Sequence, residues 1–361
     1  MSLSTIPYLR WAKTEQRRGE ILLTLSATPA VDWADIELDP AELELCRYSA
    51  YGDAALLAGL AAEVGGAEDQ VLLAASASHV HFCFAAAHLS PGDRVLYESP
   101  GYLPLVDSLS MFQVEAVRFE RRFEDGFALP VERLAGVVEQ MCPRLVLVTN
   151  LHNPSGVALT EAERRFLVQL CERFGVLVLC DEVYRPFLDP DPGPLSRLHP
   201  GIVSVNSFNK AYGLPQIRVG WGHGSRTAVE RARRVLDATT VHNSCLSDQV
   251  AAAAWRHRDA LVRRSRALAQ TSWAVTEPWL RASAIDYVAP DGGVVCFPRV
   301  PAPFADADAL REALLEVGVG VTPGRFFESP SHFRLGFGMP PARLNDAQSR
   351  ISAVLAGRIS R

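Results

Sequence analysis

The feature that most constrains the fold is a set of short, wholly apolar runs that alternate with helix-like segments. Residues 145–149 read Leu-Val-Leu-Val-Thr, and residues 176–180 read Val-Leu-Val-Leu-Cys. The segment between them opens with Thr160 and Glu163 at capping-box spacing and continues with apolar residues at helical spacing. Strands that are apolar on both faces and separated by helices are typical of a parallel sheet covered on both sides. The sequence therefore predicts an α/β fold.

The same alternation of strands and helices extends over most of the chain. Further strands are expected at residues 71–75, 94–98, 114–119, 201–205 and 217–221. Helices are expected at residues 54–64, 79–89, about 102–111, 132–140 and 310–317, and between 226 and 268 with a break near 241–244.

The length of 361 residues suggests one large domain with a smaller companion. Residues 1–45 show no clear period and are expected to form an arm that joins the smaller domain. We expect residues 46–255 to form the large domain and residues 256–361 a small carboxyl-terminal α+β domain.

Composition excludes several classes of function. The hydrophobic share of 48% and charged share of 21% are ordinary for a globular enzyme, and a net charge of -5 argues against nucleic acid as a partner. Seven cysteines lack metal-site spacing, and Cys83, Cys142, Cys180 and Cys296 are expected to be buried thiols in a reducing compartment. No zinc site, signal segment or membrane-length apolar run is found, so a cytoplasmic location without membrane contact is expected.

The stretch from 206 to 222 carries the strongest chemical signal. Lys210 and Ser207 follow the expected strand at 201–205, and Arg218 lies on the next β-like run. A lysine desolvated on such a turn has a lowered pKa and can act as an amine nucleophile. Arg218 with Ser207 would suit a phosphate. The alternative is that Lys210 is an ordinary surface lysine.

The carboxyl ends of other expected strands also carry polar groups, and these ends face the same crevice as Lys210. The turn of Ser76, Ala77 and Ser78 precedes a helix and could bind an anion, although many such turns hold only water. Tyr102 could stack on a planar ligand or simply cover the sheet edge. Asp181 would be carried into a desolvated site, which is costly unless a cation meets it. His79 and His81 are expected to be packed or partly exposed rather than catalytic.

A lysine amine, a phosphate site, a stacking tyrosine and a buried carboxylate are what pyridoxal 5'-phosphate requires. The cofactor's aldehyde bonds to a lysine, and its ring nitrogen stays protonated only beside a carboxylate. Two unit charges about 4 Å apart attract by roughly 4 kcal/mol at an effective dielectric near 20. The protonated ring would therefore be the cation that Asp181 needs.

Four motifs resemble the class I/II aminotransferases of the fold type I pyridoxal-phosphate family. They are N-P-S-G from Asn153, D-E-V-Y from Asp181, S-F-N-K from Ser207 followed by G-L-P-Q-I-R-V-G-W, and F-R-L-G-F from Phe333. The resemblance covers about residues 48–338. It implies a large domain with a mostly parallel central sheet flanked by helices, a smaller α+β domain, and transfer of an amino group between an α-amino acid and a 2-oxo acid.

The resemblance also implies roles for individual residues. Lys210 would hold the cofactor and move a proton between the substrate's α-carbon and C4', Asp181 would pair with the ring nitrogen, and Tyr102 would stack on the ring. Asn153 and Tyr184 would hydrogen-bond the ring's 3'-oxygen. The catalytic residues that the resemblance implies are Lys210, Asp181 and Tyr184.

The remaining implied roles concern phosphate, substrate and subunit contacts. The expected phosphate ligands are Ser76, Ala77, Ser78, Ser207 and Arg218. Arg334 would bind the substrate α-carboxylate. Tyr48 resembles a tyrosine that reaches the phosphate of a neighbouring subunit, which implies a homodimer with shared sites. The chain departs from the family pattern at Asn209, where serine is common, and at Ser76, where glycine is usual.

An alternative reading comes from local similarity to capreomycidine synthases, which cyclise a modified arginine by elimination chemistry on the same fold. The stretches at residues 211–221, 289–299 and 333–338 carry that similarity, whereas D-E-V-Y favours ordinary aminotransferases. A transcription regulator of the MocR type is disfavoured, because the first 45 residues are too few for a winged-helix domain. The walls of the substrate side-chain pocket are expected near residues 8–11 and at His242 and Asn243.

Overall fold

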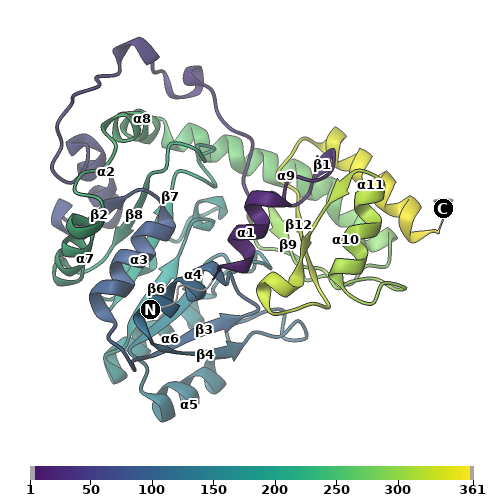
Figure 1. Ribbon diagram of the computed structural model, residues 1–361, viewed down its shortest axis with the longest axis horizontal. Helices are drawn as coiled ribbons and strands as arrows, with labels where there is room; N and C mark the ends of the chain where they lie inside the picture. Colours follow the sequence, from purple (N-terminus) through teal and green to yellow (C-terminus); the bar gives the residue numbers. More distant parts are fainter. Residues whose placement is uncertain (1–4, 358–361) are drawn as a thin grey trace.

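A seven-stranded sheet forms the centre of the computed structural model, which describes residues 5–357 (Figure 1). Residues 1–4 of the expected arm and 358–361 of the expected small domain lie outside the described residues. In sheet order the strands are β2 (Val71–Ala74), β8 (Gly220–His223), β7 (Ile202–Ser207), β6 (Leu177–Asp181), β5 (Leu145–Thr149), β3 (Arg94–Ser99) and β4 (Glu115–Glu120). Only β8 within this sheet runs antiparallel to its neighbours. The predicted mostly parallel α/β sheet is confirmed.

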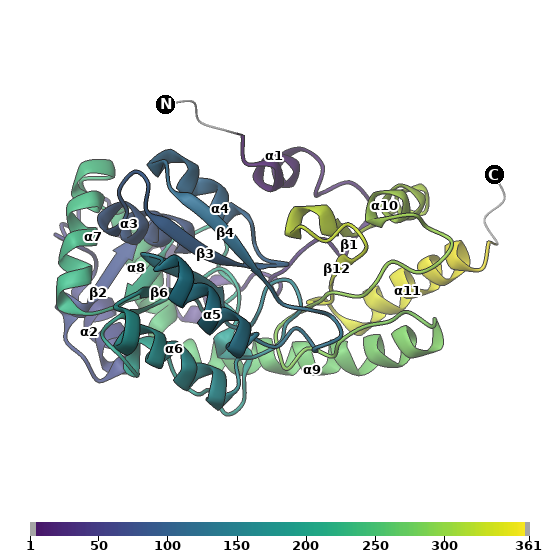
Figure 2. The same cartoon turned by 90° about the horizontal axis from the view of Figure 1, so that it is seen from below.

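Side chains alternate between the two covered faces of the sheet. In β5, Leu145 and Leu147 join the core under α3 (Ala77–His88) and α7 (Arg226–Thr239). Val146 and Val148 point the other way, into the core under α5 (Val131–Met141) and α6 (Glu161–Phe174). On that second face, α2 (Ala54–Val64) and α8 (Cys245–Arg256) continue the cover over β2 and β8. Figure 2 shows α3 and α6 on opposite sides of the sheet.

The carboxyl-terminal part is a smaller α+β unit. It contains β9 (Val295–Cys296), β10 (Val319–Gly320), β11 (Thr322–Pro323), β12 (Phe333–Gly336), α10 (Ala307–Glu316) and α11 (Pro341–Leu355). The long helix α9 (Arg258–Ala282) connects it to the central sheet, and α1 (Pro7–Thr14) lies over the junction (Figure 1). Strand β1 (Ile21–Leu22) pairs with β10 in parallel. The amino-terminal arm is therefore attached to the carboxyl-terminal part, while the boundaries near residues 46 and 256 stay predictions.

Two expected helices differ in extent. Helix α3 begins at Ala77 rather than residue 79, because the Ser76 side chain caps it by accepting from the backbone N–H of His79. The expected helix at 102–111 is instead a single turn, α4 (Pro104–Asp107), followed by a 3-10 helix. The hydroxyls of Ser108 and Ser110 bond to nearby backbone carbonyls there, which competes with a regular helix.

Two further boundaries were misplaced. The break near 241–244 is confirmed, but a second break falls at His257, and α9 then runs to Ala282 instead of residue 268. The buried side of α9 carries small or polar residues such as Ser265 and Thr276, which leave little hydrophobic periodicity to detect. The expected strand 217–221 begins only at Gly220, because Arg218 has a left-handed backbone with φ of 55°.

All seven cysteines are free thiols. Cys83, Cys180 and Cys296 are buried as predicted. The prediction for Cys142 was wrong, because this residue ends α5 in a left-handed conformation that turns it to the surface. Within residues 5–357, no helix combines the length and apolar character needed to cross a membrane.

The capping box at the start of α6 generates a stability prediction. Thr160 accepts from the backbone N–H of Glu163, and the Glu163 carboxylate accepts from the backbone N–H of Thr160. We expect Thr160→Ala to lower the free energy of unfolding by about 1 kcal/mol, the usual contribution of such a cap. Urea unfolding would measure this, with Thr271→Ala on the exposed side of α9 as control. An equal effect in both variants would contradict the prediction.

Candidate active site

The carboxyl ends of several strands meet around one cavity with about 710 Å³ of space not filled by atoms. The expected site residues that line it are Ser76, Ala77, Ser78, Tyr102, Asn153, Asp181, Tyr184, Ser207, Lys210 and Arg218. The cavity therefore brings together ten of the twelve site residues expected from the sequence, and Arg334 and Tyr48 are not among its walls.

Lys210 lies on the turn after β7 and lines the cavity. Its ammonium donates to the Ser26 hydroxyl over 2.9 Å and lies 5.5 Å from the centre of the Tyr184 ring. Removal from water lowers the pKa of Lys210 to about 8, Arg334 and Arg218 act in the same direction, and Asp181 opposes them. An uncharged amine is thus accessible near neutral pH, as a nucleophile or base requires.

One end of the cavity suits an anion. The amino terminus of α3 opens onto it with Ala77 and Ser78 in the first turn, and the same cavity is lined by Ser207 at the end of β7 and by the exposed Arg218, two residues before β8. A side chain on Gly220 would meet the backbone nitrogen of Ala77 at 2.3 Å, so glycine allows β8 to approach this turn closely. Ser76, in the place of the usual glycine, has an extended backbone that any residue can adopt.

The opposite end presents a carboxylate. Asp181 is the last residue of β6, and its side chain is nearly inaccessible to water. One carboxylate oxygen accepts from the backbone N–H of Val183 over 3.1 Å, and the other lies 3.3 Å from Nε2 of His81. No described lysine or arginine pairs with this carboxylate, so a ligand cation can still do so.

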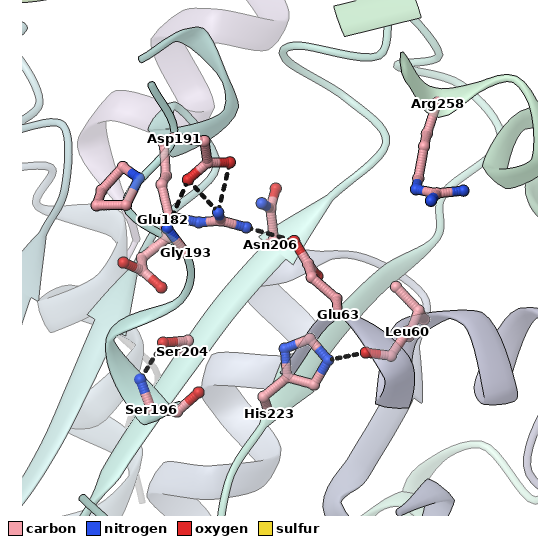
Figure 3. A network of polar contacts seen from close by, with 12 residues as sticks. Leu60, Glu63, Glu182, Asp191, Gly193, Ser196, Ser204, Asn206, His223 and Arg258 are labelled. Carbon is pink, nitrogen blue, oxygen red and sulfur yellow. Dashed lines mark hydrogen bonds and ion pairs between the residues drawn. The ribbon is translucent and has the colours of Figure 1, made fainter. Parts of the chain in front are cut away.

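A network of charged side chains around the buried Arg185 supports the turn that carries Asp181 and Tyr184 (Figure 3). Arg185 donates to Asp191 over 2.5 and 2.6 Å and to Glu63 over 2.6 Å. Glu182 accepts from the backbone N–H of Leu195 over 3.1 Å, and burial raises the pKa of this carboxyl. These bonds tie the turn to α2 and to the loop that follows it, which fixes the direction of Asp181.

Arg334 lies behind the cavity wall rather than on it. Its guanidinium is fully buried and donates to Oδ1 of Asn153 over 3.1 Å and to the Tyr8 hydroxyl over 3.0 Å. Both partners line the cavity. An incoming carboxylate could thus reach Arg334 by displacing a hydrogen bond to Tyr8 or Asn153.

Tyr48 and the loop at 242–243 lie away from the cavity. Tyr48 is 78% exposed and packs edge-on against His242, with ring centres 5.7 Å apart. Asn243 donates to the backbone carbonyl of Leu73 over 3.2 Å. Within this chain, the expectation that His242 and Asn243 line the pocket was wrong, because these contacts hold them beside α8. Of the expected wall at 8–11, Tyr8 lines the cavity, whereas Trp11 is buried against Phe326.

Sequence reasoning missed three contributors to the site. Ser26 holds the Lys210 amine, and its carbonyl accepts from the Tyr184 hydroxyl over 2.7 Å. The arm around Ser26 lacks a periodic pattern that could have placed it. The Tyr8 hydroxyl is far from Arg334 in the sequence, and only the folded chain brings the two groups together. His81, however, lies four residues after Ala77, a spacing that puts both on one side of a helix and could have linked it to the cavity.

The groups around the cavity fit pyridoxal 5'-phosphate. They offer an anion site, a lysine with a lowered pKa, an aromatic wall at Tyr102 and a carboxylate at the far end. Lys210 would face the cofactor's aldehyde, and Tyr102 would face its ring. Asp181 would face the ring nitrogen. Each polar feature of the ligand thus has a chemically matched partner.

Comparison with known proteins gives one family over most of the chain. Residues 38–351 match the family model described as aminotransferase class I and II. The chain is 33% identical to a capreomycidine synthase of Streptomyces vinaceus, over 98% of this chain and 94% of that protein. It is 29% identical to histidinol-phosphate aminotransferase 2 of Nitrosospira multiformis, over 79% of this chain and 70% of that protein.

Solved structures agree with this fold. A PLP-dependent aminotransferase from Streptococcus suis superposes with a TM-score of 0.92 at 22% identity, covering 100% of both chains. An aspartate aminotransferase from Thermus thermophilus with maleate gives 0.88 at 20% identity, covering 98% of this chain and 97% of the other. At such identities the likeness establishes the fold alone.

The lowered pKa of Lys210 can be measured directly, because the chain contains only two lysines, Lys13 and Lys210. In cofactor-free protein we expect the reactivity of Lys210 toward reductive methylation to rise through about pH 8, whereas an ordinary exposed lysine titrates near about 10.4. Peptide mass spectrometry would follow both sites, with Lys13 as internal reference. The same pH dependence at both lysines would contradict the prediction.

Proposed function

The chain belongs to the class I and II aminotransferase family, which depends on pyridoxal 5'-phosphate, and from this premise we propose that it moves an amino group between an α-amino acid and a 2-oxo acid. The observation that carries the proposal is that one cavity is lined by the Lys210 amine, with its lowered pKa, by the residues of an anion site and by the Asp181 carboxylate. This arrangement supplies a base beside a site for an electron-withdrawing ring.

In this proposal each residue has a separate task. When bound, the cofactor supplies an aldehyde that takes up the amino group and a protonated ring that withdraws electrons from the α-carbon. Lys210 would hold the cofactor until the substrate's amino group displaces its amine, and the freed amine would then move a proton from the substrate's α-carbon to C4'. Asp181 keeps the ring nitrogen protonated, and Tyr102 packs against the ring. The proposed phosphate ligands are Ser76, Ala77, Ser78, Ser207 and Arg218.

The remaining residues bind either the substrate or the 3'-oxygen of the cofactor. Arg334 binds the α-carboxylate, for which its planar guanidinium is suited. Asn153 and Tyr184 hydrogen-bond the 3'-oxygen. Asn153 accepts from Arg334 through Oδ1 and keeps its amide N–H donors for the ligand, whereas the Tyr184 hydroxyl, which donates to the Ser26 carbonyl, turns its one proton to the 3'-oxygen. Among residues 5–357, the one arginine that lines the cavity is Arg218, in the anion site. A dicarboxylic substrate is therefore not part of the proposal.

The proposal includes a homodimer in which Tyr48 reaches the phosphate of the partner subunit. An exposed apolar face supports it, formed by Leu45, Tyr48, Val241 and Leu246. The two segments that form this face are in contact, since Tyr48 packs against His242. Exposed apolar residues gathered in this way are typical of a protein interface.

A second candidate function is elimination and cyclisation of an arginine derivative. The 33% identity to a capreomycidine synthase over 98% of this chain favours it. Both reactions begin when Lys210 removes the α-proton. In transamination that proton then goes to C4'. In elimination a group instead leaves the substrate's β-carbon.

Product stoichiometry separates the two candidates. We expect a panel of amino acids, including arginine and 3-hydroxyarginine, to give at most one equivalent of 2-oxo acid per site when no acceptor is added. Addition of a 2-oxo acid should then allow continued turnover, because the amino group must be passed on. Multiple turnovers without an acceptor, with release of water or ammonia, would contradict transamination and support the second candidate.

The role of Asp181 gives a second prediction. Asp181→Asn should retain the cofactor but lower turnover by about a thousandfold, because loss of a charge pair of roughly 4 kcal/mol corresponds to three factors of ten. Steady-state kinetics on the best substrate from the panel would measure this. Near-normal turnover would show that Asp181 has only a structural role.

A further inference from the structure

We infer that His81 is a positioning residue that donates a hydrogen bond to Asp181 and so holds this carboxylate toward the ring nitrogen of the cofactor. The inference deepens the proposed function and rests on the role given there to Asp181. His81 would not touch the cofactor or the substrate. It would act through Asp181 alone.

The first support is the unusual state of the His81 ring. His81 is only 4% exposed, yet neither ring nitrogen has a regular hydrogen-bond partner among residues 5–357. Nε2 lies 3.3 Å from the Asp181 carboxylate. A buried polar ring without partners is unfavourable, and such groups in native proteins call for a functional explanation. With the proton on Nε2, a small rotation of the ring would complete this bond.

The second support is the orientation of the Asp181 carboxylate. Its other oxygen already accepts from the backbone N–H of Val183. A donor at His81 would complete a two-point grip on the carboxylate and favour its charged form.

The third support is the place of His81 on α3. Ala77, four residues earlier on the same side of the helix, lines the anion site. The same rigid helix thus contacts both the anion site and the carboxylate. A single element would set the spacing between the groups that hold the two ends of the cofactor, which is how a rigid scaffold makes a site precise.

The test compares binding of two cofactors to the cofactor-free full chain. One is pyridoxal 5'-phosphate, and the other is its 1-deaza analogue, in which carbon replaces the ring nitrogen. Titration followed by protein fluorescence gives both dissociation constants. We expect His81→Leu to lower the preference for the natural cofactor by about tenfold, because only the natural ring has a nitrogen for Asp181 to hold. His81→Gln, which restores an N–H donor, should recover most of the preference.

Controls separate this inference from the proposed function. His88→Leu removes an imidazole from the far end of the same helix and should leave the preference unchanged. Should His81→Leu fail to fold, as judged by its melting temperature, His81→Met takes its place. Asp181→Asn should also reduce the preference; if it does not, the role proposed for Asp181 is wrong. If Asp181→Asn reduces it while His81→Leu does not, or if His81→Gln is as impaired as His81→Leu, the inference about His81 is overturned.

Discussion

The structure depends on the burial of one carboxylate at the end of a central strand. Asp181 ends β6 with its side chain almost out of contact with water, and its protein contacts are a backbone N–H and the ring of His81. An uncompensated buried charge is unfavourable by several kcal/mol, and a ligand cation beside the carboxylate would offset this cost. A protonated pyridine ring held by Lys210 would be that cation. The buried carboxylate thus gives a reason for a cationic cofactor, and the cofactor gives a reason for burying the carboxylate.

Buried polar groups next to this turn are only partly paired. Arg185 has three carboxylate contacts at hydrogen-bond distance, and Glu182 has its own backbone donor (Figure 3). Hydrogen bonds connected in this way rigidify their surroundings. Nε of Arg185, the ring nitrogens of His81 and Nε of Arg334 nevertheless have no regular partner among residues 5–357. Of these groups, the His81 ring lies beside the Asp181 carboxylate, so its missing bond is the one that bears on the proposed cofactor site.

The sequence predicted the sheet and most of the cavity because both arise from local patterns. Apolar runs such as 145–149 specify buried strands, and parallel strands bring their carboxyl ends together, so Asp181, Ser207 and Lys210 had to meet. Ser26 and the Tyr8 hydroxyl were missed because they reach the site through an arm without periodicity, placed by its pairing with β10. The end of α9 was missed because its buried stripe is made of small and polar residues. Tyr48 lies far from the cavity of its own chain, and its proposed role depends on a second subunit.

The central claim is that Lys210 bonds to the cofactor, and the presence of only two lysines makes its test unambiguous. Protein incubated with pyridoxal 5'-phosphate would be reduced with borohydride, which makes a bond between lysine and cofactor permanent, and then digested for peptide mass spectrometry. The account predicts a stoichiometric cofactor mass on the peptide that contains Lys210, with Lys13 unmodified. Modification of Lys13 alone, or of neither lysine, would contradict it.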